Sequence, residues 1–341
     1  MKKRKVLFII NPKSGKGLIR NHLLDIIDIF VKNNMRVTVH TTQGAMDACR
    51  VTQKKAGKYD LVVCSGGDGT LDEVITGMMQ RPESGRRPVG YIPAGSTNDF
   101  GNSLGLPKNM KEAARCIALN HPFPCDIGGF NGDYFVYIAA FGAFTEVSYQ
   151  TKQDVKNVLG HLAYVLEGAK RLFNLKSYHM KIRIGEEVVE DEFIYGMVTN
   201  SQSVGGFKNI TGKHVHLNDG VFEVTLIKTP KNPIELQEIL GAILLREIDN
   251  KHIYYQKAER VEFESLEEIP WTLDGEFGGV HSRVEIVNYQ KAIPIMVKHI
   301  HQEALLPEEA HSVQTIARSL QQVRENQSLE TVQEEEIVEK E

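Results

Sequence analysis

Apolar runs rich in β-branched residues alternate with amphipathic stretches over the first 120 residues of the chain. The apolar runs predict buried strands, and the stretches with apolar residues three to four positions apart predict helices that cover the sheet. The predicted strands are 5–10, 35–40, 59–64 and 88–92, and the predicted helices are a segment with Leu23, Leu24, Ile27 and Val31 on one face, 47–56, 71–79 and 110–119. Four such strand–helix units predict an α/β fold with a doubly wound parallel sheet.

The pattern changes near Pro122–Asp126. Beyond this point apolar and polar residues alternate with a period of two, which is typical of antiparallel strands with one face toward water. The predicted strands are 134–144, 180–184, 193–199, 220–227, 261–263, 284–286 and 293–297, interrupted by helices near 154–173 and 233–246. We expect a second, mostly antiparallel β domain, and the cleft between two domains is the usual place for a ligand.

These patterns divide the chain into three parts. We expect an α/β domain at 1–125 that is completed by a strand from 290–298, a β-rich domain at 126–289 and an acidic helical tail at 299–341. The tail has apolar residues at heptad spacing, namely Leu306, Val313, Ile316, Leu320 and Val323. This spacing predicts an amphipathic helix that lies on the body of the protein or is partly disordered, with a short coiled coil as the alternative.

The composition is that of a soluble globular protein, with 41% hydrophobic and 25% charged residues in a chain of 341. The four cysteines form no C-x-x-C pair, which favours reduced thiols in a cytoplasmic protein. The N-terminus begins with basic residues as a signal peptide does, but the apolar run Val6–Ile10 behind them is too short. No run is long enough to span a membrane, so we expect any membrane contact to be peripheral and transient.

The net charge of −4 is unevenly distributed. Residues 302–341 carry ten Glu against three Lys or Arg, a charge of −7, which leaves +3 on residues 1–301. A mildly basic body suits an anionic ligand or an anionic lipid surface. The excess is too small for a nucleic-acid-binding protein, and no interleaving of aromatic and basic residues supports that function.

The stretch Ser65–Glu73, with the sequence SGGDGTLDE, lies between a predicted strand and a predicted helix. Its glycines permit a tight turn and a close approach of backbone or ligand, and a helix N-terminus favours an anion such as phosphate. The carboxylate of Asp68 would repel a polyphosphate unless Mg²⁺ stood between them, so the stretch predicts a site for phosphate and magnesium. Its spacing matches neither the P-loop nor the dinucleotide fingerprint, and a turn without a catalytic role is the alternative.

Two more polar turns follow predicted strands, at 11–17 and 93–99. Ligands of doubly wound sheets bind outside the carboxyl ends of the strands, so one ligand could touch all three turns. Candidates to bind phosphate oxygens in the first of these turns are Lys13, Ser14 and Lys16. For that turn, an ordinary strand–helix connection with solvated lysines is the alternative.

Four motifs occur in order along the chain. They are Asn11-Pro12-x-Ser14-Gly15, Gly66-Gly67-Asp68-Gly69-Thr70, Pro93-x-Gly95-Ser96-x-Asn98-Asp99-Phe100 and Asp274-Gly275-Glu276. In this order and at these spacings the chain resembles the diacylglycerol kinase catalytic domain family, in its bacterial soluble lipid kinase branch, over residues 4–298. NAD kinases and phosphofructokinases of the wider superfamily share the Gly-Gly-Asp-Gly turn, but the Asn-Asp-Phe run and the late Asp-Gly-Glu favour the lipid branch.

The resemblance implies a nucleotide-binding first domain, a second domain for the lipid acceptor, and ATP in the cleft between them. Ser96 stands where the family usually has threonine, and the hydroxyl is retained. Carried over by position, the residues that would bind the nucleotide are Asn11, Pro12, Lys13, Ser14, Gly15, Thr41, Thr42, Gly66, Gly67, Asp68, Gly69, Thr70, Leu71, Asp72, Ser96, Asn98 and Asp99.

The resemblance also implies the catalytic groups. Asp68 would act on catalytic Mg²⁺ with Asp126 as a helper, and Glu276 matches the proposed general base, with Asp274 beside it. Gly275 permits a sharp turn that could aim both of the latter carboxylates into one cleft, where neighbouring carboxylates raise each other's pKa. A solvated Asp-Gly hairpin is the alternative.

A structural Mg²⁺ in the second domain is a further feature of the family. Carried over by position, its ligands would be His216, Asp219 and the carbonyl of Val221. His216 stands where aspartate is common, and imidazole is a poor ligand for a hard cation. An Asp-Gly turn without a metal is the alternative.

The function that these features favour is an ATP-dependent lipid kinase that phosphorylates the hydroxyl of diacylglycerol, giving phosphatidic acid, or of a similar lipid at a membrane surface. One alternative is a kinase of a soluble acceptor such as NAD or a sugar alcohol. Another is a non-enzymatic nucleotide-binding regulator with the same fold. The sequence allows a homo-oligomer but does not predict one.

Overall fold

The structure is a computed structural model of the chain, and it describes residues 2–119, 121–142, 176–201, 203–204, 207–208, 215–245 and 251–298. The helix expected near 154–173 and the tail expected at 299–341 lie outside these described residues. Within the described ranges, no helix is long and apolar enough to cross a membrane.

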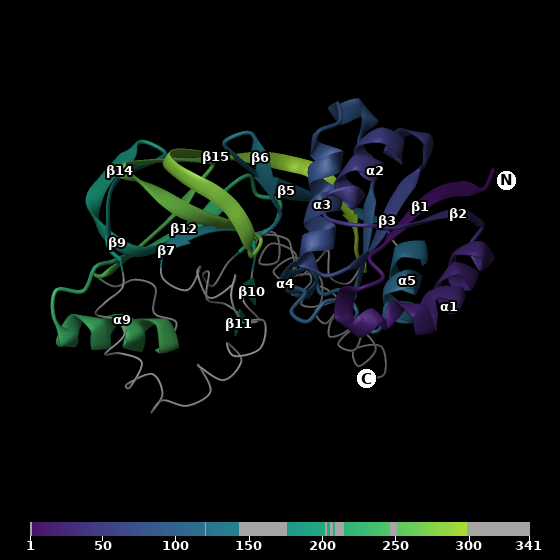
Figure 1. Cartoon of the computed structure of the whole chain (residues 1–341), viewed down its shortest axis with the longest axis horizontal. Coiled ribbons are helices and arrows are strands. Elements are labelled where there is room, and N and C mark those ends of the chain that lie inside the picture. Colours follow the sequence, from purple (N-terminus) through teal and green to yellow (C-terminus); the bar gives the residue numbers. More distant parts are fainter. Residues whose placement is uncertain are drawn as a thin grey trace, which may run out of the picture. The chain divides into compact units, whose positions relative to one another are not determined.

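The first part of the chain forms a parallel sheet with helices on both faces (Figure 1). Its strands lie in the order β2-β1-β3-β4, and they are β1 (Arg4–Ile10), β2 (Met35–Thr41), β3 (Leu61–Gly66) and β4 (Val89–Pro93). The helix α1 (Ile19–Lys32) packs beside α5 (Met110–Leu119), and α2 (Asp47–Lys55) packs beside α3 (Asp68–Met79). The predicted α/β fold with a parallel sheet is therefore confirmed.

The winding direction of this sheet changes at β1. The chain passes from β1 to β2 on one side, and then returns to β3 on the other side of β1. In sheets of this kind the crevice for a ligand lies at such a point, outside the carboxyl ends of the strands. The turns after β1 and β3 therefore flank the expected site.

The helix α3 begins earlier than the pattern predicted. The prediction was 71–79, whereas the helix begins at Asp68, directly after Gly67 in extended conformation. The apolar periodicity starts only at Leu71, which explains the late start of the prediction. Because the glycine motif itself forms the first turn, the N–H groups at the start of the helix belong to its residues, and that of Thr70 donates to the carbonyl of Gly67 at 3.0 Å.

The second part of the chain forms an antiparallel sheet, as predicted. Its strands are β5 (Pro122–Phe130), β6 (Asp133–Phe135), β7 (Ile138–Gly142), β8 (Tyr178–Ile184), β9 (Glu187–Thr199), β12 (Phe222–Lys228), β13 (Ile253–Ala258), β14 (Arg260–Leu273) and β15 (Glu276–Met296), and among the described residues they are accompanied by a small separate pair of β10 (Ser203–Val204) and β11 (Phe207–Lys208) and by the helix α9 (Pro233–Leu245). Its core is built around Trp271, whose ring lies 4.9 Å from that of Phe141 and 5.0 Å from that of Phe263, between ring centroids.

Two predictions about these strands were wrong. The single strand expected at 134–144 is divided into β6 and β7, because the backbone N–H groups between them bond a buried carboxylate instead of a neighbouring strand. The short strands expected at 261–263, 284–286 and 293–297 are parts of β14 and β15, which are much longer. Polar residues on the wet face of these strands break the apolar pattern without breaking the strand.

The strand β15 passes from the second sheet into the first. Its register with β5 shifts between Tyr289 and Ile293, and Lys291 in this interval has a left-handed backbone with φ 53°. Such a bulge bends a strand. Beyond the bulge Ile295 pairs in parallel with Val89 of β4, so β15 adds a fifth strand to the N-terminal sheet.

Candidate functional site

Three glycine-containing turns meet at the carboxyl edge of the parallel sheet. A β-carbon on Gly95 would lie 2.6 Å from the Cα atom of Gly67, so the turns after β3 and β4 touch backbone to backbone. Gly15, in the turn after β1, has φ +55°, and a β-carbon there would lie 1.7 Å from the carbonyl oxygen of Ala94. The predicted meeting of the three turns is therefore what the structure contains, and it depends on the absence of side chains at these positions.

The turn after β1 is tied to the glycine motif by Asn11. Its Nδ2 atom donates to Oγ1 of Thr70 at 3.1 Å, and its Oδ1 atom accepts the N–H of Lys13 at 3.0 Å. Ser14 lies 3.6 Å, through its Oγ atom, from the position of a β-carbon on Gly67. Pro12 is partly buried at the start of this turn. The backbone and hydroxyl groups of the two turns thus line one small region.

Of the other residues assigned to the nucleotide, Thr42 and Ser96 lie in turns, whereas the side chain of Leu71 is buried. Thr42 starts the turn after β2, and its N–H donates to the carbonyl of Ile10 at 2.8 Å, beside the first turn. Ser96 is exposed in the turn after β4. Leu71, by contrast, is 1% exposed, so its side chain belongs to the core and only its backbone can face a ligand.

Asn98 holds the turn after β4 in shape. Its backbone is left-handed with φ 53°, its Oδ1 atom accepts the N–H of Gly95 at 2.9 Å and the hydroxyl of Tyr91 at 3.0 Å, and its Nδ2 atom donates to the carbonyl of Gly95. Asparagine tolerates this backbone conformation better than most residues. The side chain that the sequence assigned to the nucleotide is therefore bonded within the turn.

Asp68 lies between the glycine motif and this turn. Its Oδ2 atom accepts the N–H of Asp99 at 3.2 Å, whereas its Oδ1 atom is buried and has no hydrogen-bond partner among the described residues. Burial raises the pKa of Asp68 to about 6, with a further contribution from the charge of Asp99 and an opposing one from backbone N–H groups of residues 98–100. A buried carboxylate oxygen without a partner fits a divalent cation that is shared with phosphate oxygens.

Glu276 comes from the second domain and lies against the glycine motif. A type I′ turn, with φ 51° at Asp274 and 85° at Gly275, connects β14 to β15 immediately before it. The Oε1 atom of Glu276 lies 3.7 Å from the position that a β-carbon on Gly69 would take, and Glu276 is exposed. The carboxylate that the sequence assigned as the base therefore reaches the first turn of α3.

Asp274 differs from the expected partner carboxylate, because it is 4% exposed. Its Oδ2 atom accepts the N–H of Val136 at 2.6 Å, and its Oδ1 atom accepts those of Tyr137 at 2.9 Å and Ile138 at 3.0 Å. Burial raises the pKa of Asp274 above its usual range in spite of these donors. Asp274 anchors the turn that carries Glu276, and its oxygens are bonded within the protein.

Asp72 lies next to Asp274 in the same buried region. Burial raises its pKa well above the usual range for a carboxyl group, and the charge of Asp274 adds to this effect. Two carboxyl groups that lie this close share a proton more readily than they carry two charges. The structure brings Asp72 to the anchor of the hairpin, and this contact was not expected from the sequence.

Asp126, expected as a helper of Asp68, bonds groups of the second domain instead. It is fully buried and accepts the N–H of Lys291 at 2.6 Å and that of Gly220 at 2.7 Å, with Nδ2 of Asn288 at 3.3 Å. Lys291 belongs to the bulge of β15, and Gly220 belongs to the turn before β12. The carboxylate thus stabilises the point where β15 leaves the second sheet.

The residues expected to bind a structural metal surround the same turn. The Oδ1 atom of Asp219 accepts the N–H of Val221 at 3.3 Å, and its Oδ2 atom lies 3.6 Å from Nζ of Lys257, which also pairs with the fully buried Glu223 at 3.1 Å. The buried Nδ1 atom of His216 has no hydrogen-bond partner among the described residues. Among the residues that the structure describes, no group of three His, Cys, Asp or Glu side chains is arranged to hold a metal ion. The second metal site remains a prediction from the family.

Glu73 is a residue of the glycine motif to which the sequence gave no role. Its Oε1 atom accepts the N–H of Met46 at 2.8 Å, and its Oε2 atom accepts that of Ala48 at 3.0 Å. Both donors are at the N-terminus of α2, where the helix leaves N–H groups unpaired. Only the sheet topology could have revealed this contact, because α2 and α3 are neighbours in space and not in the local sequence pattern.

Comparisons with known proteins agree with this architecture. Residues 5–130 match the model of the diacylglycerol kinase catalytic domain, and residues 139–297 match that of the YegS C-terminal NAD kinase beta sandwich-like domain. A "Diacylglycerol kinase" of Bacillus subtilis (strain 168) is 33% identical over 311 residues, which cover 91% of this chain and 98% of the relative. A protein of the same name from Staphylococcus carnosus (strain TM300) is 32% identical over 280 residues, 81% of this chain and 90% of the relative.

Solved structures show the same fold. The crystal structure of a putative diacylglycerol kinase from Bacillus anthracis str. Sterne has a TM-score of 0.75 at 28% identity, and it covers 88% of this chain and 97% of that one. A second structure of a putative diacylglycerol kinase from the same strain has a TM-score of 0.74 at 27% identity, over 90% of this chain and 100% of that one. The first matched model covers the glycine motif and the second covers the Glu276 hairpin, and the chain therefore belongs to the bacterial diacylglycerol kinase family.

Proposed function

We propose that this protein is an ATP-dependent lipid kinase that transfers the γ-phosphoryl group of ATP to the hydroxyl of diacylglycerol or a similar lipid. The observation that carries the proposal is the position of Glu276 against the first turn of α3. Phosphoryl transfer requires in-line positioning, charge neutralisation and a base near the acceptor hydroxyl. The residues that we assign to these tasks come from both domains.

The three glycine-containing turns are the proposed seat of the triphosphate. The turn after β3 leads directly into the N-terminus of α3, and the backbone N–H groups at a helix N-terminus bind phosphate oxygens well. The hydroxyls of Ser14 and Thr70 and the amide of Asn11 border the same region. The absence of side chains at Gly15, Gly67 and Gly95 lets the three turns pack closely, so that their backbone groups would converge on the phosphates.

Asp68 is the proposed protein ligand of Mg²⁺, through its buried and unbonded Oδ1 atom. When bound, the cation would neutralise charge on the phosphates. Glu276 would accept the proton of the lipid hydroxyl while the oxygen forms a bond to the γ-phosphorus and the bond from that phosphorus to ADP breaks. Asp274 holds the turn that aims Glu276, through its bonds to residues 136–138.

The lipid acceptor requires a visit to a membrane surface, which we propose to be peripheral. The basic body of the protein, +3 over residues 1–301, would favour anionic lipids. A kinase of NAD or of another soluble alcohol would need no such surface. The choice of acceptor therefore separates the proposal from its alternatives.

A label-transfer assay tests the proposal. The purified protein is incubated with γ-labelled ATP and Mg²⁺, and with diacylglycerol or other lipids in mixed micelles or with NAD, and the labelled product is identified. We expect label in phosphatidic acid and none in a soluble product. Transfer to NAD, or ATP binding without transfer to any acceptor, would contradict the lipid kinase proposal.

A further inference from the structure

The loop after β2 starts next to the region described above. It runs from Thr42 to Met46 and connects β2 to α2. Its first residue bonds Ile10, the last residue of β1, so the loop starts beside the turn that contains Asn11. Thr41 and Thr42, both expected to contact the nucleotide, lie at its start.

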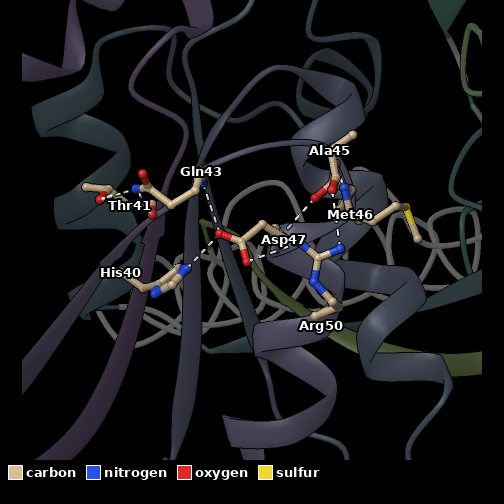
Figure 2. A network of polar contacts seen from close by, with 9 residues as sticks. His40, Thr41, Gln43, Ala45, Met46, Asp47 and Arg50 are labelled. Carbon is tan, nitrogen blue, oxygen red and sulfur yellow. Dashed lines mark hydrogen bonds and ion pairs between the residues drawn. The ribbon is translucent and has the colours of Figure 1, made fainter.

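Asp47, the first residue of α2, fixes the first half of the loop (Figure 2). Its Oδ2 atom accepts the N–H of Gln43 at 3.0 Å and lies 3.0 Å from Nε2 of His40, and its Oδ1 atom pairs with Arg50 at 3.5 Å. Gln43 in turn donates through Nε2 to the carbonyl of Thr41 at 2.9 Å. These contacts are all local, because they join residues within a few positions of one another.

The second half of the loop is held from a distance by Glu73. Met46 has a left-handed backbone with φ 60°, a conformation that costs a residue with a β-carbon about 1–2 kcal/mol. The Oε1 atom of Glu73 accepts the N–H of this same residue at 2.8 Å, and the Oε2 atom accepts that of Ala48 at 3.0 Å. The two charge-assisted bonds offset the strain and fix the point where the loop enters α2.

Glu73 lies on α3, whose first turn contains Asp68, Gly69 and Thr70. Residues three and four positions apart share a face of a helix, so Glu73 lies on the same face as Gly69 and Thr70. One helix therefore carries the proposed phosphate site at its N-terminus and holds the β2 loop one turn later. The distance between these two parts of the site is fixed by the rigidity of the helix.

We propose that Glu73 is a positioning residue of the nucleotide site: it fixes the Thr42–Met46 loop relative to the phosphate turn, so that ATP affinity depends on a side chain bonded to the loop backbone. This inference rests on the proposed function, because it assigns the loop to the wall of the ATP site. Loss of Glu73 allows the loop to leave its bound-state conformation, and ATP must then order it on binding. The effect therefore falls on affinity, and much less on the chemical step.

The test compares Glu73→Ala and Glu73→Gln with Glu112→Gln. Glu112 is a control of the same type, since it is an exposed helical glutamate that pairs with Arg115. Hydrogen bonds to a charged acceptor are worth about 1.5–3 kcal/mol each, so Glu73→Ala should raise KM and Kd for MgATP by about 10-fold or more, with kcat little changed. Glu73→Gln keeps one acceptor and should show a smaller increase, and Glu112→Gln none.

Amide hydrogen exchange supplies a second readout that does not depend on activity. The amides of Met46 and Ala48 should exchange faster in both Glu73 variants than in wild type, in the absence of nucleotide, and MgATP should restore part of the protection. A purely structural role would instead lower the melting temperature and the active fraction while KM for ATP stayed unchanged, and that result would overturn the inference. Unchanged exchange at these two amides would overturn it as well.

Direct calorimetry with MgATP separates this inference from the proposed function. If wild type binds MgATP but transfers no phosphoryl group to lipid, the proposed acceptor is wrong, and the Kd values still decide the role of Glu73. If wild type does not bind MgATP, both the proposed function and the positioning role are wrong.

Discussion

Glu276 and Gly69 belong to different domains, and the carboxylate of the first lies 3.7 Å from where a β-carbon on the second would be. This relationship leaves a space of about one side-chain atom between the carboxylate and the N-terminal turn of α3. In the proposed reaction the acceptor hydroxyl and the γ-phosphoryl group meet near this space. The first two predictions test it from its two sides.

Glu276→Gln removes the proposed base with almost no change of shape. We expect kcat to fall by about 10²–10⁴-fold, the usual contribution of a general base, with KM for ATP little changed because the turns of the first domain hold the nucleotide. Steady-state kinetics with diacylglycerol in mixed micelles measures both. Glu264→Gln, an exposed carboxylate on β14 that pairs with Arg283, is the control. Lost ATP affinity with normal kcat would assign Glu276 to the nucleotide site instead.

Gly69→Ala adds one methyl group on the other side of the space. A contact at 3.7 Å is ordinary van der Waals contact, and Gly69 is helical, so we expect a folded protein with equal or greater stability, by up to about 1 kcal/mol. The methyl group should displace the reacting groups, and a misplacement of this size can reduce kcat by about 10²-fold. Thermal unfolding and kcat are measured together. A stable variant with wild-type kcat would show that the reaction takes place elsewhere.

Asp68→Asn tests the proposed magnesium ligand. We expect transfer activity to be lost at every Mg²⁺ concentration, because the amide cannot compensate the cation's charge. Without nucleotide the variant should be at least as stable as wild type at pH 8, since burial raises the pKa of Asp68 to about 6 and the wild-type carboxylate is charged there at a cost. Melting curves in EDTA measure the stability without nucleotide, and activity assays across a Mg²⁺ titration measure the loss of transfer. Activity that returns at high Mg²⁺ would contradict an essential carboxylate.

Gly15→Ala and Gly185→Ala separate a close contact from backbone strain. The two glycines have similar left-handed φ values, +55° and +60°, but a β-carbon would meet Ala94 at 1.7 Å in the first case and nothing within 4 Å in the second. Both variants should show the strain of about 1–2 kcal/mol in the free energy of unfolding. For Gly15→Ala the free energy of unfolding should fall clearly further, or the variant should fail to fold. Equal losses in urea unfolding would mean that the turns do not touch as the structure has them.

Glu223→Gln tests the buried pair with Lys257 through pH. Burial raises the pKa of Glu223 to about 8, with an opposing effect from Lys257. A carboxyl group with a raised pKa holds its proton longer in the folded state, so wild type loses stability as pH rises from about 4.5 toward 8. The stability of Glu223→Gln relative to wild type should therefore increase between pH 5 and pH 8, measured by unfolding in EDTA. A difference that stays constant or shrinks would contradict the raised pKa.

The sequence was informative about the first domain because its signals are local. Each glycine turn follows a buried strand directly, and the parallel arrangement brings the ends of those strands to one edge. The position of Gly15 against Ala94 and of Gly67 against Gly95 follows from that arrangement. The start of α3 was missed by three residues because its first turn is glycine and polar residues, which do not contribute to an apolar period.

The sequence was least informative where a side chain bonds a distant backbone. Asp274 bonds Tyr137 across 137 positions, and Asp126 bonds Lys291 across 165. A buried carboxylate with backbone donors looks the same in sequence as one in an open cleft, because its donors have no residue signature. For this reason the sequence could not show that Asp274 and Asp126 each stabilise a bend of the chain, and the catalytic roles assigned to them stay predictions.

The path of β15 has a consequence for synthesis on the ribosome. The edge of β4 is covered by residues that emerge some 200 positions later, because Val89 of β4 pairs with Ile295 of β15. Until those residues leave the exit tunnel, the nascent N-terminal sheet has an unpaired edge strand, and such edges invite association between chains. Nascent polypeptides released before residue 290 should accordingly require chaperones to remain in solution, even though they contain every strand of the first domain but one.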